Sequence, residues 1–367
     1  MLHRKESMQN ITIFGGGNIG TQFACQLAIK GYCVNIYTSK PQTYNGTLEI
    51  VDEDNKIIEG KINKATSNIN DAMEQCDAIF ITHPAFMFSE DAKLLLPFIK
   101  KGLIIFVIPG TGGAEFAFKE CIEKGAILAG LQRVPSVARL EEYGRRVRCE
   151  GYRDQLYLGS IPHNEALRLS SFMENIWDIK CNPLPNYLCV TLTPSNPILH
   201  TSRLATMYED YSDGTIYDNN PLFYGEWTDK SSKRLINCDQ ELQNICKAMN
   251  KLDLHDVRSL KLHYESETIE AMTKKLSSIK SLHNLKSPMI QVKNGWIPDF
   301  SSRYFTADFP YGLAIIESLA EILKIDVPNI KKTMDWYYKV TGNTKSFNLK
   351  DYGINDLTDI YKFYSNL

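Results

Sequence analysis

A glycine-rich turn near the N-terminus limits the fold of this chain more than any other feature. The short apolar segment Ile11–Phe14 runs into the sequence G-G-G-N-I-G at Gly15–Gly20, which matches the pattern G-x-G-x-x-G. In this pattern Gly15 permits a tight turn, Gly17 lets the backbone approach a pyrophosphate, and Gly20 lets a helix pack closely on a strand. Glycine turns also serve plain packing, but this one stands between an expected strand and an expected helix. We therefore expect a dinucleotide at the N-terminal end of that helix.

The segments that follow the turn predict a doubly wound parallel sheet. Short β-branched segments alternate with helical stretches, at 11–14, 33–37, 78–82, 103–108 and 126–131. Such alternation is typical of an α/β Rossmann domain, whose parallel sheet carries helices on both faces. Two antiparallel hairpins are expected beside it, at 47–62, where Glu53–Asn55 supplies turn residues, and at 147–161. A helix over 163–176 closes the region.

The end of the second expected strand bears on which dinucleotide binds. An NAD enzyme usually carries Asp or Glu there, to accept hydrogen bonds from the ribose 2′-hydroxyl. This chain has Thr38, Ser39 and Lys40 instead, and two hydroxyls and an ammonium suit a 2′-phosphate. We therefore expect NADP in preference to NAD, with Lys40 as a solvated loop charge as the alternative. The expected cofactor-binding residues are Gly15, Gly17, Asn18, Ile19, Gly20, Thr38, Ser39 and Lys40.

Two further loops are candidates for binding substrate. The loop 109–113, with the sequence P-G-T-G-G, follows the expected strand 103–108. Ligands sit at the carboxyl ends of strands in open α/β sheets, so Thr111 and Gly112 are expected to border the nicotinamide or the substrate. Plain turn chemistry explains this loop equally well. Arg133, after the next strand, is a candidate for holding a carboxylate, with an ordinary ion pair as the alternative.

Beyond about Thr193 the apolar residues recur at spacings of three and four, which predicts helices. The three apolar stripes run over Leu235–Met249, Ile269–Leu282 and Leu313–Ile322. Prolines at 183, 185 and 194 mark the change of period. We therefore expect two domains, a dinucleotide-binding Rossmann domain over 1–190 and an all-α substrate domain over 191–367.

The amino-acid composition limits the kinds of binding partner that we expect for this chain. The 41 basic and 43 acidic side chains nearly cancel, so no global field recruits nucleic acid or an anionic membrane. Nine cysteines without a Cys-x-x-Cys pair argue against a disulfide framework or a metal cluster, and favour a reducing cytoplasm. The most apolar run, Leu103–Ile108, is far shorter than the roughly 20 residues that cross a bilayer, and the charged N-terminus lacks the features of a secretory signal. A homodimer is compatible with such a chain.

One of the seven histidines stands out as a proton carrier. His200 ends the segment S-N-P-I-L-H, in which Ser195 or Asn196 can cap a helix and Pro197 suits its first position. The helix dipole at that end disfavours a positive ring, so a catalytic His200 would need a carboxylate partner. Asp308, in a polar and aromatic segment, is the best-placed candidate, although a histidine at a helix start is often only structural. Among the others, His83 is a candidate for supporting the cofactor edge, and the weaker candidates are His3, His163, His255, His263 and His283.

The surroundings of His200 and Asp308 resemble those of the opine dehydrogenases, the octopine and nopaline dehydrogenase family. The resemblance is carried by N-P-x-x-H at Asn196–His200 and by R-Y-x-T-x-D-x-P-x-G-L at Arg303–Leu313. Segments 208–214 and 222–227 also resemble that family's helical domain, and the likeness extends from about Ile11 to Gly342. One departure is Ala307, where the family often has an acidic residue before the aspartate.

This resemblance implies a reductive condensation, in which a 2-oxo acid such as pyruvate joins the amino group of an amino acid or amine and the imine is reduced by NAD(P)H. It assigns His200 as general acid/base, Asp308 as the residue that orients its ring, and Arg303 as a partner for a substrate carboxylate. The alternatives are a 2-oxo acid or keto-alcohol reductase of the glycerol-3-phosphate or ketopantoate type, and a non-catalytic NADP-binding sensor. The product could be nutritional, fermentative or a metal chelator, as in staphylopine-like members.

Overall fold

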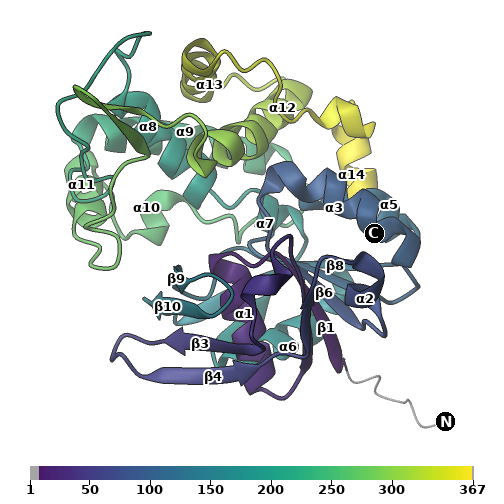
Figure 1. Ribbon diagram of the computed structural model, residues 1–367. Coiled ribbons are helices and arrows are strands. Elements are labelled where there is room, and N and C mark those ends of the chain that lie inside the picture. Colours follow the sequence, from purple (N-terminus) through teal and green to yellow (C-terminus); the bar gives the residue numbers. More distant parts are fainter. Residues whose placement is uncertain (1–7, 366–367) are drawn as a thin grey trace. The chain divides into compact units, whose positions relative to one another are not determined.

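The structure, a computed structural model, describes residues 8–365, so His3 lies outside the described residues. The chain forms two compact units, Met1–Val190 and Thr191–Leu367 (Figure 1). Each unit has its own secondary structure and its own packed interior, and each is described separately below. Among residues 8–365, none of the helices combines the length and apolar character that a membrane crossing requires.

An eight-stranded sheet is the centre of the first unit. Its strands lie in the order β12-β11-β8-β7-β6-β1-β2-β5, and all neighbours are parallel except β11 and β8. This confirms the predicted α/β Rossmann fold, in which the two strands at one edge, β11 and β12, run opposite to the other six. The strands are β1 Asn10–Phe14, β2 Cys33–Tyr37, β5 Lys64–Thr66, β6 Ala78–Ile81, β7 Ile104–Val107, β8 Ile127–Leu131, β11 Gln155–Ile161 and β12 Lys180–Pro183.

Helices cover both faces of this sheet, as a doubly wound topology requires. On one face α1 (Asn18–Ile29) and α6 (Ala166–Trp177) contact each other, and Phe23 meets Trp177 with ring centroids 4.8 Å apart. On the other face lie α3 (Phe88–Leu95), α4 (Ala114–Ala117) and α5 (Lys119–Glu123) (Figure 1). The central strands β1, β6, β7 and β8 are almost wholly buried, because parallel strands that are covered on both faces exclude water. The remaining short helices of this part of the chain are α2 Ile69–Met73 and α7 Leu188–Thr191.

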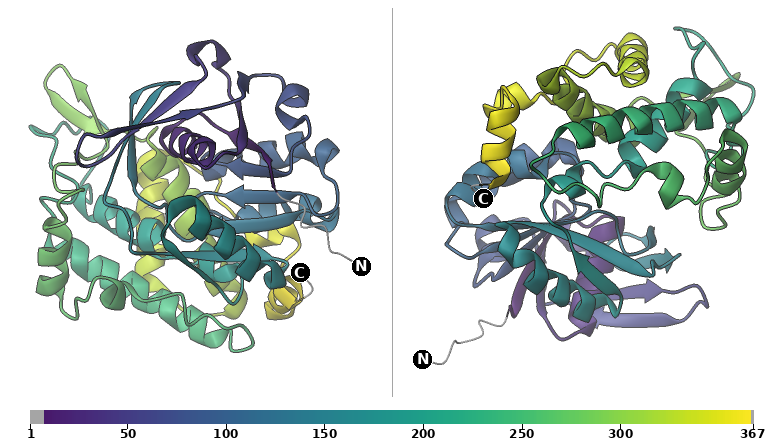
Figure 2. Two further views of the ribbon diagram at one scale, coloured as in Figure 1. Left: turned by 90° about the horizontal axis from the view of Figure 1, so that it is seen from below. Right: turned by 180° about the vertical axis from the view of Figure 1, so that it is seen from behind.

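A second, four-stranded sheet packs against α1, in the order β4-β3-β10-β9 (Figure 2). The predicted hairpin at 47–62 is confirmed as β3 (Thr47–Val51) and β4 (Ile57–Lys61). The predicted hairpin at 147–161 is wrong. Its first half is β10 (Arg146–Glu150), which pairs with β9 (Val137–Glu142) and with β3, whereas its second half is β11 of the main sheet.

The error has a local cause, because glycines in a left-handed conformation stand at both ends of β10. Gly144 has φ +76° and Gly151 has φ +61°, so either position can support a turn. The turn at Gly144 makes the hairpin. Buried Glu49 on β3 then fixes the edge of β10, because its carboxylate accepts from Arg145 and from Arg146.

The second unit is mainly helical and is organised around the long helix α9 (Asp229–Ala248), which contacts five other α-helices (Figure 2). Two π-helical segments, η5 (Ser195–His200) and η6 (Tyr304–Leu313), contact each other. The expectation of an all-α domain needs one correction, because β13 (Met289–Val292) and β14 (Gly295–Pro298) form a small hairpin. The other helices are α8 Thr201–Met207, α10 Leu260–His263, α11 Ile269–Ser277, α12 Ala314–Leu323, α13 Pro328–Thr341 and α14 Leu357–Ser365.

The second apolar stripe extends beyond its helix. Helix α11 ends at Ser277, so Ile279 and Leu282 lie in the turn that follows. The Ser277 and Ser278 hydroxyls donate to carbonyl oxygens of the last turn, which offers the backbone an alternative to further helix. The spacing of apolar residues gives no information about these hydrogen bonds, so it predicts a helix longer than the observed one.

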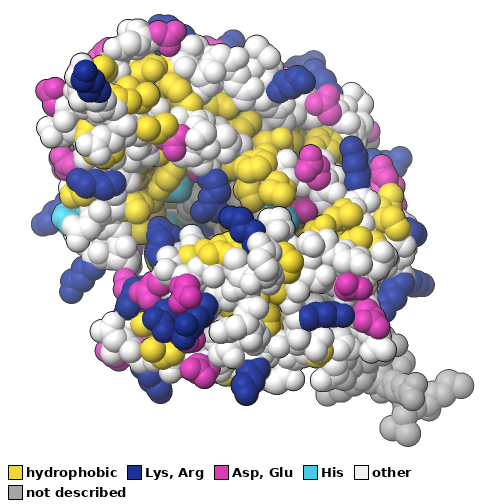
Figure 3. Space-filling model, in the orientation of Figure 1, with side chains coloured by type: hydrophobic (Ala, Val, Ile, Leu, Met, Phe, Trp, Pro, Cys, Tyr) yellow, Lys and Arg dark blue, Asp and Glu magenta, His cyan; other side chains and the backbone are white. Residues whose placement is uncertain are grey.

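Charged side chains of both signs mix on the face shown in Figure 3, as the nearly equal counts of basic and acidic residues require. No group of three His, Cys, Asp or Glu side chains within the described part of the chain could hold a metal ion. All nine cysteines are free thiols.

The buried carboxyl of Asp239 on α9 predicts a pH-dependent stability. Asp239 accepts a hydrogen bond from the Leu260 N–H at 2.7 Å, and burial raises its pKa to about 7. The unfolded chain would release this proton near pH 4, so the folded protein binds more protons between about pH 4 and pH 7. The free energy of unfolding that this group contributes therefore falls as pH rises through that window.

We expect Asp239→Asn, which keeps an acceptor oxygen but cannot ionise, to remove this fall in the free energy of unfolding with rising pH. The melting temperature of the variant should exceed that of the wild type at pH 8, and the difference should shrink at pH 5. Thermal unfolding of the full chain at both pH values measures it. A difference that is the same at pH 5 and pH 8 would contradict the assignment.

Candidate active site

The glycine turn of the first unit has the geometry that its sequence predicts. Gly15 has φ +105°, which L side chains rarely adopt, and its N–H donates to the Tyr37 carbonyl at 3.1 Å. A Cβ atom on Gly20 would lie 1.9 Å from the Gly15 carbonyl oxygen. Helix α1 can therefore approach β1 this closely only because residue 20 is glycine.

Gly17 differs from the other two glycines of the motif. Its φ of −78° is ordinary, and a Cβ atom at this position would meet no atom within 4 Å. The chain's own packing therefore does not require glycine here, whereas close approach of a phosphate to the backbone would. Gly17 is also the N-cap of α1 and supplies no side-chain cap, so this helix end suits an anion. The residues present thus fit a dinucleotide.

Asn18 and Ile19, two of the predicted cofactor-binding residues, use their side chains for packing. The Asn18 Oδ1 atom accepts from the Leu140 N–H at 2.9 Å and so joins α1 to β9. Ile19 is partly buried against the hydrophobic core. A dinucleotide would therefore meet these two residues through their backbone.

At the end of β2, the residues expected to select NADP meet a tyrosine that sequence reasoning missed. The Thr38 hydroxyl is 3.0 Å from the Tyr143 hydroxyl, and the Lys40 ammonium lies 5.4 Å from the centre of the Tyr143 ring. Ser39 and Lys40 are exposed. A Cβ on Gly16 would lie 2.7 Å from the Tyr143 hydroxyl and 2.1 Å from that of Tyr44. Four hydroxyls and one ammonium thus gather beside the glycine turn, without an Asp or Glu at the strand end.

Tyr143 could not be found from the sequence, because it comes from the β9–β10 turn of the other sheet. Strands of both sheets pack on α1, which brings the β9–β10 turn beside the end of β2. No local pattern near residue 143 indicates this.

The other predicted residues of the first unit lie at strand ends, as expected. Gly112 has φ +92° and Gly113 has φ +74°, so the turn into α4 explains both glycines without a ligand. Thr111 lies in the same loop, and Arg133 follows β8 and is half-buried. Their roles in substrate binding stay predictions.

His83, after β6, forms a His–Asp pair that the sequence analysis did not predict. Its Nδ1 atom is 3.0 Å from both carboxylate oxygens of Asp91, a buried residue of α3. A Cβ on Gly15 would lie 2.9 Å from the His83 ring. His83 therefore packs directly against the glycine turn, on the side away from the end of β2.

In the second unit, His200 and Asp308 lie in contact. His200 Nδ1 is 2.8 Å from Asp308 Oδ2, and both side chains are largely buried. His200 is the last residue of η5, and Asp308 lies in the middle of η6. The sequence analysis paired these two residues, and their catalytic role stays a prediction.

The two π-helical segments explain how this contact forms. Each contains a proline, Pro197 in η5 and Pro310 in η6, and a proline inside a helix removes a backbone donor and widens the turn. The segments approach closely at Gly312, where a Cβ would lie 3.1 Å from Pro197. The sequence analysis expected Ser195 or Asn196 to cap this helix and Pro197 to be its first residue, which is wrong in detail. In the structure η5 begins at Ser195, Pro194 is in the cap position, and no side chain caps the helix.

Aromatic side chains surround the His200 ring and one of them contacts its second nitrogen. The Tyr224 hydroxyl lies 3.1 Å from His200 Nε2. The ring centroids of Tyr304 and Phe223 are 4.7 and 5.5 Å from that of His200. Tyr224 is only 6% exposed. It is a second residue that sequence reasoning missed, although the segment 222–227 that contains it had been noted for its family resemblance.

Arg303 stands immediately before η6, as its N-cap residue, and is exposed. Within the described residues it has no ion pair. The next residue, Tyr304, reaches the His200 ring, so Arg303 lies one position away from the residues that surround the His–Asp pair.

Known families match both parts of the chain. The model of the NAD/NADP octopine/nopaline dehydrogenase alpha-helical domain matches residues 183–341, which include His200, Tyr224 and Asp308. The model of ketopantoate reductase PanE/ApbA matches residues 11–163. The two matches do not overlap, and together they cover most of the chain.

Individual proteins of known activity match this chain over nearly its whole length. The chain is 25% identical over 369 residues to tauropine dehydrogenase of Arabella iricolor, with 90% of this chain and 91% of the relative covered. Octopine dehydrogenase with NADH and pyruvate superimposes with a TM-score of 0.81 at 20% identity, covering 96% and 97% of the two chains. Yersinopine dehydrogenase with NADP+ gives a TM-score of 0.67 at 12% identity and 97% coverage of both. The chain is therefore similar to opine dehydrogenases over nearly its whole length, and these comparisons support an NAD- or NADP-dependent oxidoreductase that acts on CH–NH donors.

Proposed function

We propose that this protein is an opine dehydrogenase that condenses a 2-oxo acid, pyruvate in the first instance, with the amino group of an amino acid or amine. The observation that carries the proposal is the 2.8 Å contact between His200 and Asp308 in the helical unit. A binding protein has no need for a buried proton carrier with a carboxylate partner. A non-catalytic sensor is therefore disfavoured.

The reaction needs proton transfer at two stages, and His200 is the proposed carrier for both. The amine nitrogen attacks the carbonyl carbon, and loss of water gives an imine. A hydride and a proton then convert the imine into a secondary amine. The reduced nicotinamide, when bound, supplies the hydride. The His200 ring takes a proton from the attacking amine and delivers one to the departing water, while Asp308 orients the ring and stabilises its charged form.

A substrate carboxylate is expected at Arg303, since a 2-oxo acid carries one and a guanidinium binds carboxylates in a bidentate manner. Arg303 is exposed, has no ion pair within the described residues and adjoins Tyr304 at the His200 ring. Thr111, Gly112 and Arg133 are proposed to contribute from the first unit, on the basis of their place at strand ends. Pyruvate is proposed because octopine dehydrogenase, which shares the fold, is known with NADH and pyruvate bound.

NADP is the proposed cofactor, with NAD as the alternative. Related folds occur with either, since octopine dehydrogenase is known with NADH and yersinopine dehydrogenase with NADP+. In this chain Thr38, Ser39 and Lys40 occupy the end of β2, where a carboxylate would repel a 2′-phosphate. The nearby Tyr143 hydroxyl adds a further donor. The backbone of Gly15–Gly20 would hold the pyrophosphate.

The test of the proposed function is an assay with pyruvate, NADPH and each amino acid in turn, with products identified by mass spectrometry. An opine dehydrogenase should oxidise NADPH only when an amine is present. A ketopantoate-type reductase, which the match to residues 11–163 suggests, would reduce an oxo acid without an amine. NADPH oxidation that is independent of every amine would exclude the proposal.

His200→Ala should then lower kcat by about 10²-fold to 10⁴-fold, because a positioned acid/base contributes that much. The dissociation constant of NADPH, measured by fluorescence, should stay within about twofold. The matched control is His255→Ala, which removes a histidine from an exposed His–Asp pair of the same unit. Substantial activity in the His200 variant would refute its assigned role.

Two glycines of the turn should respond differently to alanine. Gly17→Ala meets no steric obstacle, so it should leave the melting temperature unchanged but weaken NADPH binding tenfold or more, about 1.4 kcal/mol. Gly20→Ala forces a Cβ against the Gly15 carbonyl, so it should lower the melting temperature itself. Unchanged NADPH affinity in Gly17→Ala would place the dinucleotide elsewhere.

Cofactor choice is tested by kcat/KM with NADPH and with NADH. We expect a clear preference for NADPH, and Lys40→Ala should reduce that preference by about tenfold, because a charge-assisted contact to the 2′-phosphate is lost. Lys56→Ala serves as control, since Lys56 is an exposed lysine beside the start of β4 in the same unit. A wild-type preference for NADH would make Lys40 a solvated loop charge.

A further inference from the structure

The Tyr224 hydroxyl and the Asp308 carboxylate occupy the two nitrogens of the His200 ring. A carboxylate only accepts hydrogen bonds, so His200 Nδ1–H donates to Asp308 at 2.8 Å. In the neutral ring Nε2 then has a lone pair, and the Tyr224 hydroxyl donates to it at 3.1 Å. Tyr224 therefore holds the ring in one orientation and one tautomer from the side opposite Asp308.

Tyr224 lies in an irregular turn, 222–227, between α8 and α9. Local bonds within the turn include the Leu222 N–H to the Glu226 carboxylate and the Trp227 N–H to the Tyr224 carbonyl at 2.9 Å. The start of the turn pairs with the segment 285–286, through the β-bridge between Leu222 and Lys286 and the Phe223 N–H that donates to the Leu285 carbonyl at 2.7 Å. The centre of the turn, which carries Tyr224, belongs to no helix or sheet. Something outside it must hold the Tyr224 hydroxyl at the distance observed.

The side chain of Arg203 on α8 anchors this centre of the turn from both sides. Its Nε–H donates to the Phe223 carbonyl at 3.0 Å, and one terminal N–H donates to the Glu226 carbonyl at 2.7 Å. The two acceptors flank Tyr224, one on each side in the sequence. The other terminal N–H donates to the Ser231 hydroxyl at 3.2 Å, and the guanidinium lies 5.5 Å from the Trp227 ring.

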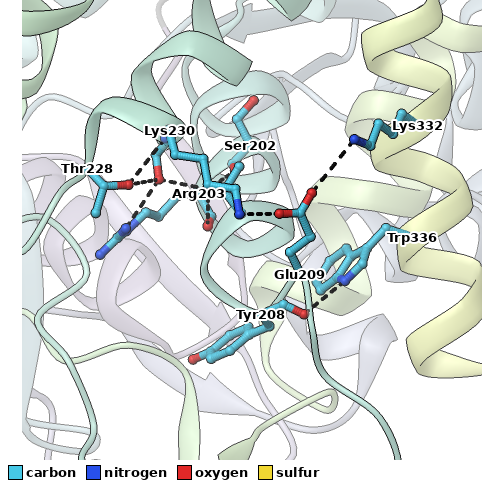
Figure 4. Close-up of polar contacts among 10 residues, drawn as sticks. Ser202, Arg203, Tyr208, Glu209, Thr228, Lys230, Lys332 and Trp336 are labelled. Atoms are coloured by element: carbon cyan, nitrogen blue, oxygen red, sulfur yellow. Dashed lines mark hydrogen bonds and ion pairs between the residues drawn. The ribbon is translucent and has the colours of Figure 1, made fainter.

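Figure 4 shows how this anchor is built into the surrounding helices. Arg203 extends from α8 towards Thr228, which caps α9 through a bond to the Ser231 N–H. Just after the end of α8, Glu209 forms ion pairs with Lys230 of α9 and Lys332 of α13, and the Trp336 side chain of α13 donates to the Tyr208 carbonyl at 3.1 Å (Figure 4). Helix α8 is thus joined to α9 and α13, so the origin of the Arg203 side chain is itself fixed.

Burying this guanidinium is costly, which makes a merely structural role a poor explanation. Arg203 is 3% exposed, and burial lowers its pKa to about 10. No carboxylate of the described residues lies within ion-pair distance of it. Apolar residues of similar volume often stabilise a buried position at least as well as a charged group does. What they cannot supply is a planar fork of donors for two backbone carbonyls.

We propose that Arg203 and Tyr224 are positioning residues for His200. The buried guanidinium fixes the turn 222–227 through the Phe223 and Glu226 carbonyls, and the turn holds the Tyr224 hydroxyl on His200 Nε2. The inference rests on the proposed function only for its kinetic consequence. The structural part concerns the state of the His200 ring and can be measured without turnover.

The first test is a ¹H–¹⁵N spectrum of the histidine side chains in the full-length protein, with His200 assigned from a His200→Gln variant. Tyr224→Phe, which is nearly isosteric, and Arg203→Lys should both move the Nε2 resonance of His200. Arg234→Lys is the matched control, because Arg234 lies in the same unit and donates to Thr333 instead of the turn. A His200 resonance that stays at its wild-type position in Tyr224→Phe or Arg203→Lys would overturn the proposal.

The second test is a double-mutant cycle on kcat. Tyr224→Phe and Arg203→Lys should each lower kcat by about tenfold, the effect of one hydrogen bond, with KM for the oxo acid within about twofold. Because Arg203 acts through Tyr224, the double variant should lose less than about twofold more than Tyr224→Phe alone. Additive losses would show that Arg203 acts elsewhere and would overturn the proposal.

Two outcomes need separate treatment. If Arg203→Lys does not fold, Arg203→Gln replaces it, and an unchanged kcat in Tyr224→Phe overturns the proposal in either case. If the wild type has no opine dehydrogenase activity, the proposed function fails while the histidine spectrum still decides the positioning. The failure of one inference is thus distinguishable from that of the other.

Discussion

The hydrogen bond between His200 and Asp308 joins residues 108 positions apart in the chain, and the arrangement of the helical unit makes it possible. Neither residue lies in a regular α-helix. Both are carried by π-helical segments whose turns are widened around Pro197 and Pro310. The two segments meet where Gly312 has no side chain, and this close approach places a carboxylate at the imidazole. The same segments continue into α8 and α12, so His200 and Asp308 are each attached to a regular helix of the second unit.

Much of the first unit could be predicted because its signals are local. The strand, the glycine turn and the helix that follows need only a few consecutive residues, and Gly15 and Gly20 are required by backbone conformation and by steric contact. The alternation of buried strands and helices is also a short-range pattern. His200 and Asp308 were predicted as a pair from the chemical needs of a proton carrier and from the resemblance of their segments to one family.

The features that were missed depend on contacts between segments that are distant in the sequence. Tyr143 reaches the end of β2 because a second sheet packs on α1, and no sequence pattern around residue 143 indicates that packing. The β9–β10 hairpin was predicted one strand too late, since Gly144 and Gly151 offer equivalent turns and only the pairing with β3 distinguishes them. Arg203 has the appearance of an ordinary helix-surface arginine until the structure shows that it is buried.

A His–Asp contact alone does not define an acid/base site, as the three histidines that contact aspartates within the described residues show. His255 is largely exposed, so water and salt screen its contact with Asp253. His83 is held by Asp91 at one nitrogen, but its ring packs against Gly15 and has a structural use there. Among the three, only His200 combines a largely buried carboxylate partner at Nδ1, aromatic neighbours and a separately anchored hydroxyl at Nε2. Proton transfer at a fixed atom requires a ring with one orientation and one tautomer, and Asp308 at Nδ1 together with Tyr224, anchored by Arg203, sets both.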